Sequence, residues 1–191
     1  YSKIIGTPIA FWASEKVCDI FDKSQSLSEI AEPKTGLQTG SNDIFLRRWN
    51  EVSIENVGFG LSDIDEAVLS HKKWFPYNKG GDYRKWFGNN EFIVNWENDG
   101  EEIRNFKDIN GKLRSRPQNL EFYFKESISW GLITSGGCSF RYFPNGFIYD
   151  VAGMSYFTEK DMLHSLGILN NKLYYDLTKV LNPTINLQIG D

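Results

Sequence analysis

Residues 72–86 bring cations, aromatic side chains and glycines together in one short segment. The segment holds five Lys and Arg, five aromatic residues and the pair Gly80-Gly81 within fifteen positions. Cations neutralise phosphates, aromatic faces stack on bases, and glycines let backbone amides approach a ligand closely. The segment therefore indicates a contact with nucleic acid. The alternative is a loop whose aromatic residues cap a core while Lys and Arg lie along them with their charged ends in water.

Positive charge is concentrated in the middle third of the chain, although the formal net charge is −4. Residues 71–141 carry 12 Lys and Arg against 9 Asp and Glu, whereas residues 1–70 carry 6 against 11. An anionic partner is therefore expected to bind the middle third. The candidate contacts are Lys72, Lys73, Lys79, Arg84, Lys85, Arg104, Lys107, Lys112, Arg114, Arg116 and Arg141.

Motifs for catalysis or metal binding are not apparent. His71 and His164 are far apart in sequence, and Cys18 and Cys138 lack the short spacing of zinc ligands. There is no Gly-x-Ser-x-Gly elbow and no dinucleotide fingerprint. We therefore expect neither a metal site nor a catalytic centre in these residues.

The composition is that of a globular protein, with 40% apolar and 24% charged residues in 191 positions. No apolar run approaches the roughly 20 residues that a membrane span requires. Two cysteines indicate a reducing compartment, so we expect a cytoplasmic protein. Tyr rather than Met at position 1, and a strand-like run at the last residues, suggest a piece of a longer protein.

The pattern of apolar residues and turns predicts an α+β fold, in a single domain over residues 1–191. We expect a mixed or antiparallel twisted sheet with flanking helices and a helical C-terminal end. Helices are predicted at residues 14–21, 61–70, 158–169 and 171–181, and strands at residues 43–49, 92–94, 128–134, 139–143 and 147–151. Asn145-Gly146, between two aromatic runs, predicts a hairpin, and Asn110-Gly111 predicts a turn within a basic stretch.

Four stretches point to a family when they are taken together. They are WFPYNKGGDYRKWFGNN at 74–90, VNWENDG at 94–100, RYFPNGFIYD at 141–150 and LNPTINLQIGD at 181–191. These stretches resemble the C-terminal portion of PglX, the adenine-specific DNA methyltransferases of BREX phage-defence systems. The loop at residues 35–42 resembles the start of target-recognition domains in fused methyltransferases and type I specificity subunits. The similarity extends from about Leu27 to Asp191.

The resemblance implies a target-recognition domain separated from its catalytic half. In that family an N-terminal domain, which is not in this chain, binds S-adenosylmethionine and flips an adenine. This chain would then bind no cofactor and methylate nothing alone. Its expected partners are double-stranded DNA, the N-terminal catalytic domain of the same chain and other defence proteins, with no membrane partner. Most of the cations would contact phosphates, while one or two Arg with Asn42, Asn89 or Gln118 would pair with base edges.

Two other functions remain open from the sequence. Six Trp and nine Tyr, several beside Asn and Asp, also fit a module that binds carbohydrate or peptide. A scaffold surface that meets other proteins of a defence complex is the other alternative, and the acidic first third would suit such a contact.

Overall fold

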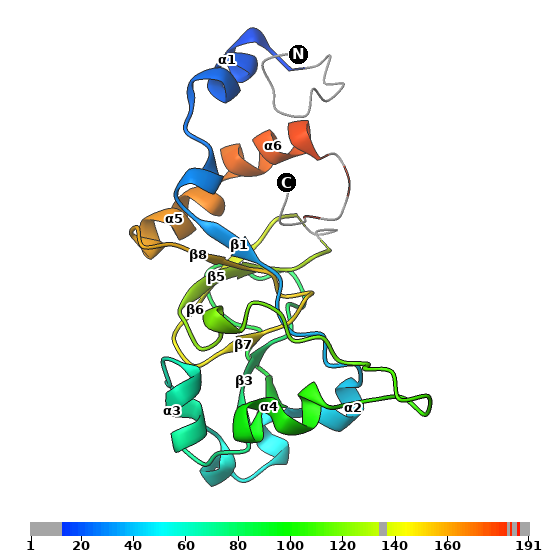
Figure 1. Cartoon of the computed structure of the whole chain (residues 1–191). Helices are drawn as coiled ribbons and strands as arrows, with labels where there is room; N and C mark the ends of the chain where they lie inside the picture. Colours follow the sequence, from blue (N-terminus) through cyan, green and yellow to red (C-terminus); the bar gives the residue numbers. More distant parts are fainter. Residues whose placement is uncertain (1–12, 134–136, 183, 185–186, 188–191) are drawn as a thin grey trace.

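The computed structural model describes residues 13–133, 137–182, 184 and 187. Short helices and strands follow one another along the chain, and the α+β class expected from the sequence is confirmed. The strands form two four-stranded sheets, whereas the sequence led us to expect one. Figure 1 shows an elongated molecule in which one sheet lies below the other, with helices at both ends of the long axis.

The first sheet has the order β1-β8-β5-β6 and is antiparallel throughout. Its strands are β1 (Glu32–Lys34), β8 (Ser155–Phe157), β5 (Ser127–Trp130) and β6 (Phe140–Phe143). Helices α5 (Met162–Leu169) and α6 (Lys172–Leu181) pack on it through a core that includes Ile128, Phe140 and Leu166. The N-terminal helix α1 (Glu15–Lys23) packs in turn against α6, where Val17 and Phe21 meet Val180.

The second sheet has the order β2-β4-β3-β7. Its strands are β2 (Leu46–Arg48), β4 (Phe92–Asn95), β3 (Trp74–Asn78) and β7 (Ile148–Tyr149), of which β7 runs parallel to β3 and the other neighbours are antiparallel. Helices α2 (Asn42–Phe45), α3 (Ile64–Leu69) and α4 (Glu97–Arg104) lie around this end of the molecule (Figure 1). Phe75, Val94 and Ile148 are fully enclosed in its core.

Buried polar and aromatic contacts join the two sheets. The Asn78 amide, at the end of β3, donates to the Ser129 hydroxyl of β5 at 2.6 Å and to the Gly153 carbonyl at 3.2 Å. Phe157 of the first sheet packs against Tyr149 of the second, with ring centroids 5.4 Å apart. Since buried polar groups require partners, these bonds fix how the sheets meet.

The hairpin predicted at Asn145-Gly146 is wrong. The turn exists, but β6 before it belongs to the first sheet and β7 after it to the second, so the two strands do not pair. The turn instead docks on a third segment, because the Gly146 amide donates to the Phe124 carbonyl and the Phe124 amide to the Phe147 carbonyl. The local Asn-Gly sequence determines that the chain reverses direction, whereas tertiary packing determines which strand each neighbouring segment pairs with.

Most helix predictions are confirmed, and their caps explain where the helices start. Ser14 and Asn171 accept hydrogen bonds from the first turns of α1 and α6. Helix α5 starts later than predicted, because Asp161 caps it while Thr158 bonds the Ile30 carbonyl instead. The strand predicted at residues 43–49 is wrong in its first half, where α2 forms. No helix in the described part of the chain is long and apolar enough to cross a membrane.

Candidate nucleic-acid interface

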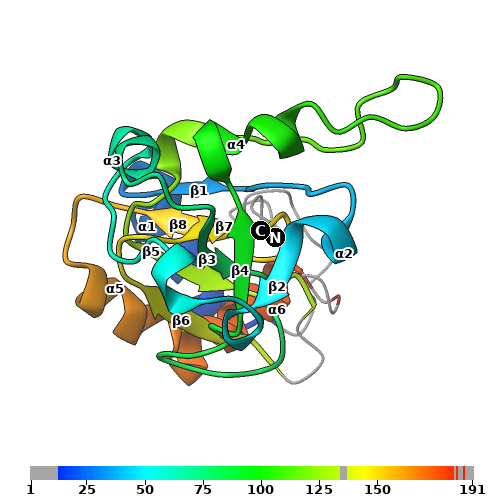
Figure 2. The same ribbon diagram turned by 90° about the horizontal axis from the view of Figure 1, so that it is seen from below.

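A two-stranded loop at residues 105–116, which we call the arm, projects from the end of α4. It reaches well beyond the body of the protein, to the right in Figure 1 and to the upper right in Figure 2. The Arg114 amide donates to the Phe106 carbonyl at 2.9 Å, and the Asp108 amide donates to the Lys112 carbonyl at 2.9 Å. The predicted turn at Asn110-Gly111 is confirmed at its tip, where Gly111 has a φ of +79°.

The base of the arm is attached firmly to α2, α4 and the loop before α2, beside the second sheet. Arg116 and Gln38 exchange two backbone hydrogen bonds, of 2.8 and 3.1 Å, and the Ser115 hydroxyl donates to the Ile103 carbonyl. The Phe106 ring packs edge-on against Phe45 of α2, with centroids 5.1 Å apart. The arm is therefore a defined extension of the fold whose base is packed and whose tip is not.

The arm is strongly basic and its cations are exposed. Lys107, Lys112, Arg114 and Arg116 lie on it, and none of them forms a salt bridge with an acidic side chain of the described residues. The one acid of the arm, Asp108, accepts hydrogen bonds from the backbone amides of Asn110 and Lys112 at 2.8 and 2.9 Å. Its charge is thus used within the turn, and the cations are left available to an anion.

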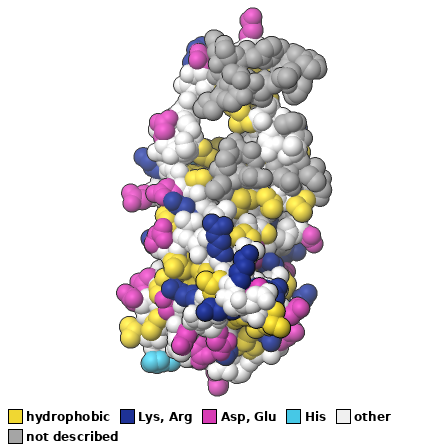
Figure 3. Space-filling model, turned by 45° about the vertical axis from the view of Figure 1, so that its right-hand side comes forward, with side chains coloured by type: hydrophobic (Ala, Val, Ile, Leu, Met, Phe, Trp, Pro, Cys, Tyr) yellow, Lys and Arg dark blue, Asp and Glu magenta, His cyan; other side chains and the backbone are white. Residues whose placement is uncertain are grey.

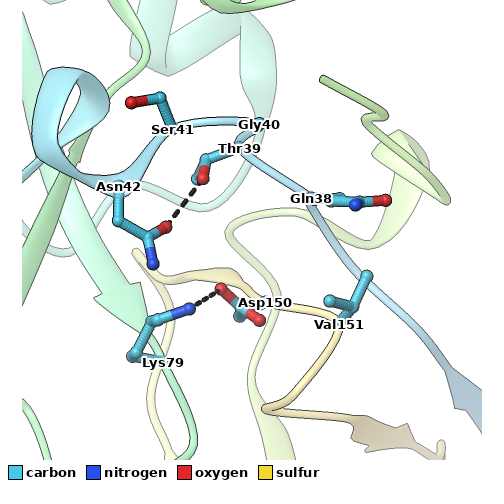
Figure 4. Close-up of a pocket in the computed structure, with 8 residues that line it drawn as sticks. All are labelled: Gln38, Thr39, Gly40, Ser41, Asn42, Lys79, Asp150 and Val151. Carbon is cyan, nitrogen blue, oxygen red and sulfur yellow. Dashed lines mark hydrogen bonds and ion pairs between the residues drawn. The ribbon is translucent and has the colours of Figure 1, made fainter. Parts of the chain in front are cut away.

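A small polar pocket of about 260 Å³ lies next to the base of the arm. Residues 38–42, before and at the start of α2, form one wall, and Lys79, Asp150 and Val151 form the other (Figure 4). The Thr39 hydroxyl donates to the Asn42 side-chain oxygen at 2.7 Å, which leaves the amide nitrogen of Asn42 directed toward Lys79 and Asp150. Thr39 is buried, whereas Gln38 and Asn42 are exposed, and exposed side-chain amides are suited to reading base edges.

Gly40 holds the pocket loop against the arm. A Cβ at this position would lie 2.7 Å from the carbonyl carbon of Arg114, and its φ of +77° is unfavourable for other residues. Together with the Gln38–Arg116 pairing, this close backbone contact makes the pocket and the arm one continuous surface.

Asp150 is the buried anchor of the pocket. Its carboxylate, 4% exposed, accepts hydrogen bonds from Lys79 Nζ at 2.7 Å, from the Tyr77 hydroxyl at 2.8 Å and from the Ala152 amide at 2.7 Å. Burial, with the negative charge of Asp150, raises the pKa of Tyr77 well above its usual value, so the hydroxyl keeps the proton that it donates. Lys79 is thus partly neutralised, and it forms part of the pocket wall.

Other predicted cations are engaged within the protein. Lys73 forms ion pairs with Glu97 at 3.2 Å and Glu102 at 3.6 Å, and Arg104 pairs with Asp99 at 2.8 Å. The ammonium groups of two more lysines donate to backbone carbonyls, Lys72 to Glu55 and Lys85 to Asn170. Such bonds reduce the charge that these side chains present to a partner.

Arg141 is a correction to the predicted contacts, because its side chain is completely buried. The guanidinium lies beneath the segment that follows β3, where Nη1 donates to the carbonyls of Arg84 at 3.3 Å and Asp82 at 3.5 Å. Burial, and secondly the charge of Arg84, lower the pKa of Arg141 to about 10. Arg141 therefore supports the segment above it and does not reach an external phosphate.

The segment that first indicated nucleic-acid binding is divided between core and surface. Phe75 and Tyr77 are fully buried, in agreement with the packing alternative. Tyr83 and Trp86 are about half exposed, at 54% and 53%, and Arg84 lies exposed between them. Asn89, considered as a base reader, is buried and bonds the carbonyls of Gly80 and Asp82.

Exposed Lys and Arg side chains gather on one side of the protein. Figure 3 shows Lys and Arg side chains gathered in the middle of the side on which the arm projects, with acidic side chains along its margins. Asn42, Lys112, Arg114 and Arg116 are brought together around the arm and the pocket. The sequence reasoning did not name Gln38 as a site residue, although it lies in the loop at residues 35–42 that carries the resemblance, and it missed Ile109, which no local motif marks. Among the described residues, no group of three His, Cys, Asp or Glu side chains could hold a metal ion.

Comparison with known proteins gives close relatives over the whole chain. It is 40% identical over 194 residues to the adenine-specific methyltransferase PglX of Lacticaseibacillus casei (strain Zhang), and the match covers 100% of the chain and 16% of that relative. It is 38% identical over 196 residues to the adenine-specific methyltransferase BrxX of Escherichia coli O9:H4 (strain HS), of which 15% is covered. No family model matches the chain.

The resemblance to PglX seen in the sequence is thereby confirmed. The whole chain corresponds to the C-terminal part of these methyltransferases and spans about one sixth of their length.

Proposed function

We propose that the chain is the DNA-recognition domain of an adenine-specific methyltransferase of the PglX type, acting in the cytoplasm. The observation that carries the proposal is the basic arm beside the amide-lined pocket. The catalytic part of the same protein would bind S-adenosylmethionine and flip the target adenine. The 191 residues of this chain would hold that catalytic part at the correct position on the DNA.

The arm supplies the sequence-independent part of this binding. Lys107, Lys112, Arg114 and Arg116 are free to contact phosphates, which fix the position of a protein on the duplex. The sequence-dependent part falls to the groups beside the base of the arm. The side-chain amide of Gln38 offers a donor and an acceptor, the combination that pairs with the N6 and N7 atoms of adenine, and Asn42 adds its amide nitrogen as a donor, since its oxygen accepts from Thr39.

Duplex binding as a function of salt tests the proposal. We expect both the full-length methyltransferase and the 191-residue chain to bind a fluorescent duplex with an affinity that falls steeply as KCl is raised. If the four arm cations contact phosphates, log K should change with log[KCl] with a slope of about −3 to −4. Anisotropy titrations between low and physiological salt measure this slope. Duplex binding that does not depend on salt, or no binding by the full-length protein, would contradict the proposal.

A further inference from the structure

The tip of the arm carries an apolar side chain that the fold does not use. Ile109 is 99% exposed and Leu113, opposite Lys107 in the arm, is 54% exposed. Turns favour Gly, Pro, Asn, Asp and Ser, and Ile is not among the preferred residues. An isoleucine that packs against nothing in the folded chain forgoes the free energy that its burial would provide. Among the described residues Ile109 is the most exposed of the large apolar side chains, so it is fully available to a contact outside the chain.

The shape of the arm fits one groove of duplex DNA. The major groove of undistorted B-DNA, about 12 Å wide, admits a two-stranded ribbon, whereas the minor groove, about 6 Å wide, receives one only where the duplex is bent and the groove widened. Three to four residues separate Phe106 from the tip, so the arm reaches about 10 to 13 Å at the rise of an extended strand. That reach exceeds the depth of the major groove, about 8.5 Å, and the tip can touch the base edges.

The charges of the arm suit a groove walled by two phosphate backbones. Side chains alternate between the faces of an extended strand, so Lys107 lies on one face of the ribbon and Lys112 on the other. Arg114 shares the face of Lys112 and lies over the Phe106 ring, 5.6 Å from its centroid, near the base of the arm. The ribbon therefore has cations on both sides and near its base, and an apolar tip.

From these contacts we infer that the arm enters the major groove of the duplex and that Ile109 at its tip contacts the 5-methyl group of thymine. This inference rests on the proposed function and specifies how the duplex is read. Thymine is the base that presents an apolar group in the major groove, and an apolar side chain is its complement. The basic residues around Ile109 favour DNA over an apolar protein surface as the partner.

Uracil substitution tests the contact directly. The full-length methyltransferase is titrated with a duplex carrying the site that it methylates, and with the same duplex in which every thymine is replaced by uracil. We expect the wild type to bind the uracil duplex about fourfold more weakly for each methyl group contacted. Ile109→Ala should bind the two duplexes equally. The substitution removes no contact within the described fold, so the variant should remain folded.

Leu173→Ala is the matched control, because Leu173 is also exposed, at 60%, but lies on α6 at the other end of the molecule. It should discriminate thymine from uracil as the wild type does. Competition with netropsin, a minor-groove ligand, should leave binding unchanged. The inference would be overturned if the wild type and Ile109→Ala discriminated thymine from uracil equally, or if netropsin displaced the protein from the duplex. Salt-dependent duplex binding in the same experiments would still support the proposed function. Absence of all duplex binding by the wild type would overturn both.

Discussion

Replacement of Lys112, Arg114 and Arg116 by alanine is expected to reduce duplex affinity at low salt to roughly a hundredth of the wild-type value. Each exposed cation of the arm is free to form a charge-assisted bond with a phosphate, worth roughly 1 kcal/mol or more. The slope of log K against log[KCl] should become less negative by about 3, because three phosphates would no longer be neutralised by the protein. Anisotropy titrations at several KCl concentrations give both quantities.

A charge-matched control separates contact from general electrostatics. Lys16→Ala, Lys23→Ala and Lys172→Ala remove the same charge from α1 and α6, at the other end of the molecule (Figure 1). This second triple variant should retain the wild-type slope. Circular dichroism spectra of both triple variants check that the compared proteins are folded. If the two variants showed the same affinity and the same salt slope, the arm would not be the phosphate-binding element.

The second large effect is on stability. Asp150→Asn is expected to lower the free energy of unfolding by about 2 to 4 kcal/mol, because the buried carboxylate is the common acceptor for Lys79, Tyr77 and the Ala152 amide. The side-chain NH2 group of Asn would face one of the N–H or O–H groups that now donate to the carboxylate, so that hydrogen bond would be lost. Lys79 would also be left without a counter-charge. Urea denaturation followed by circular dichroism measures the change, and the melting temperature should fall by about 5 to 10 °C.

Asp176→Asn is the control for burial. Asp176 forms an ion pair with Lys172 at 2.6 Å, but both side chains are exposed, at 51% and 85%. An exposed pair contributes little, so this variant should be destabilised by no more than about 0.5 kcal/mol. Equal destabilisation of the two variants would contradict the role of Asp150 as the anchor between the pocket and the second sheet.

Local signals in the sequence predicted the elements well. Ser14 and Asn171 mark helix starts because their side chains satisfy free amides of the first turn, a contact that spans only a few residues. Asn110-Gly111 marked the tip of the arm for a similar local reason, since Gly adopts the positive φ that the turn needs. Elements whose cause is local can be predicted from the sequence alone.

Features that depend on distant partners were not predictable in the same way. Nothing near residues 145–146 shows that β6 and β7 belong to different sheets, because their partners, β5 and β3, lie elsewhere in the sequence. Arg141 was predicted to be a surface cation, yet its side chain is completely buried and donates to the carbonyls of Asp82 and Arg84. Gln38 became part of the candidate site only through its pairing with Arg116, 78 positions later.

An exchange of segments tests most directly whether these residues read DNA. The 191 residues are replaced, in the full-length methyltransferase, by the corresponding segment of the Lacticaseibacillus casei relative, and the methylated adenines are located by sequencing. We predict that the hybrid methylates the sequence recognised by the protein that donated the segment, since phosphate contacts and base readout would move together. An active hybrid that kept the original target sequence would contradict the account.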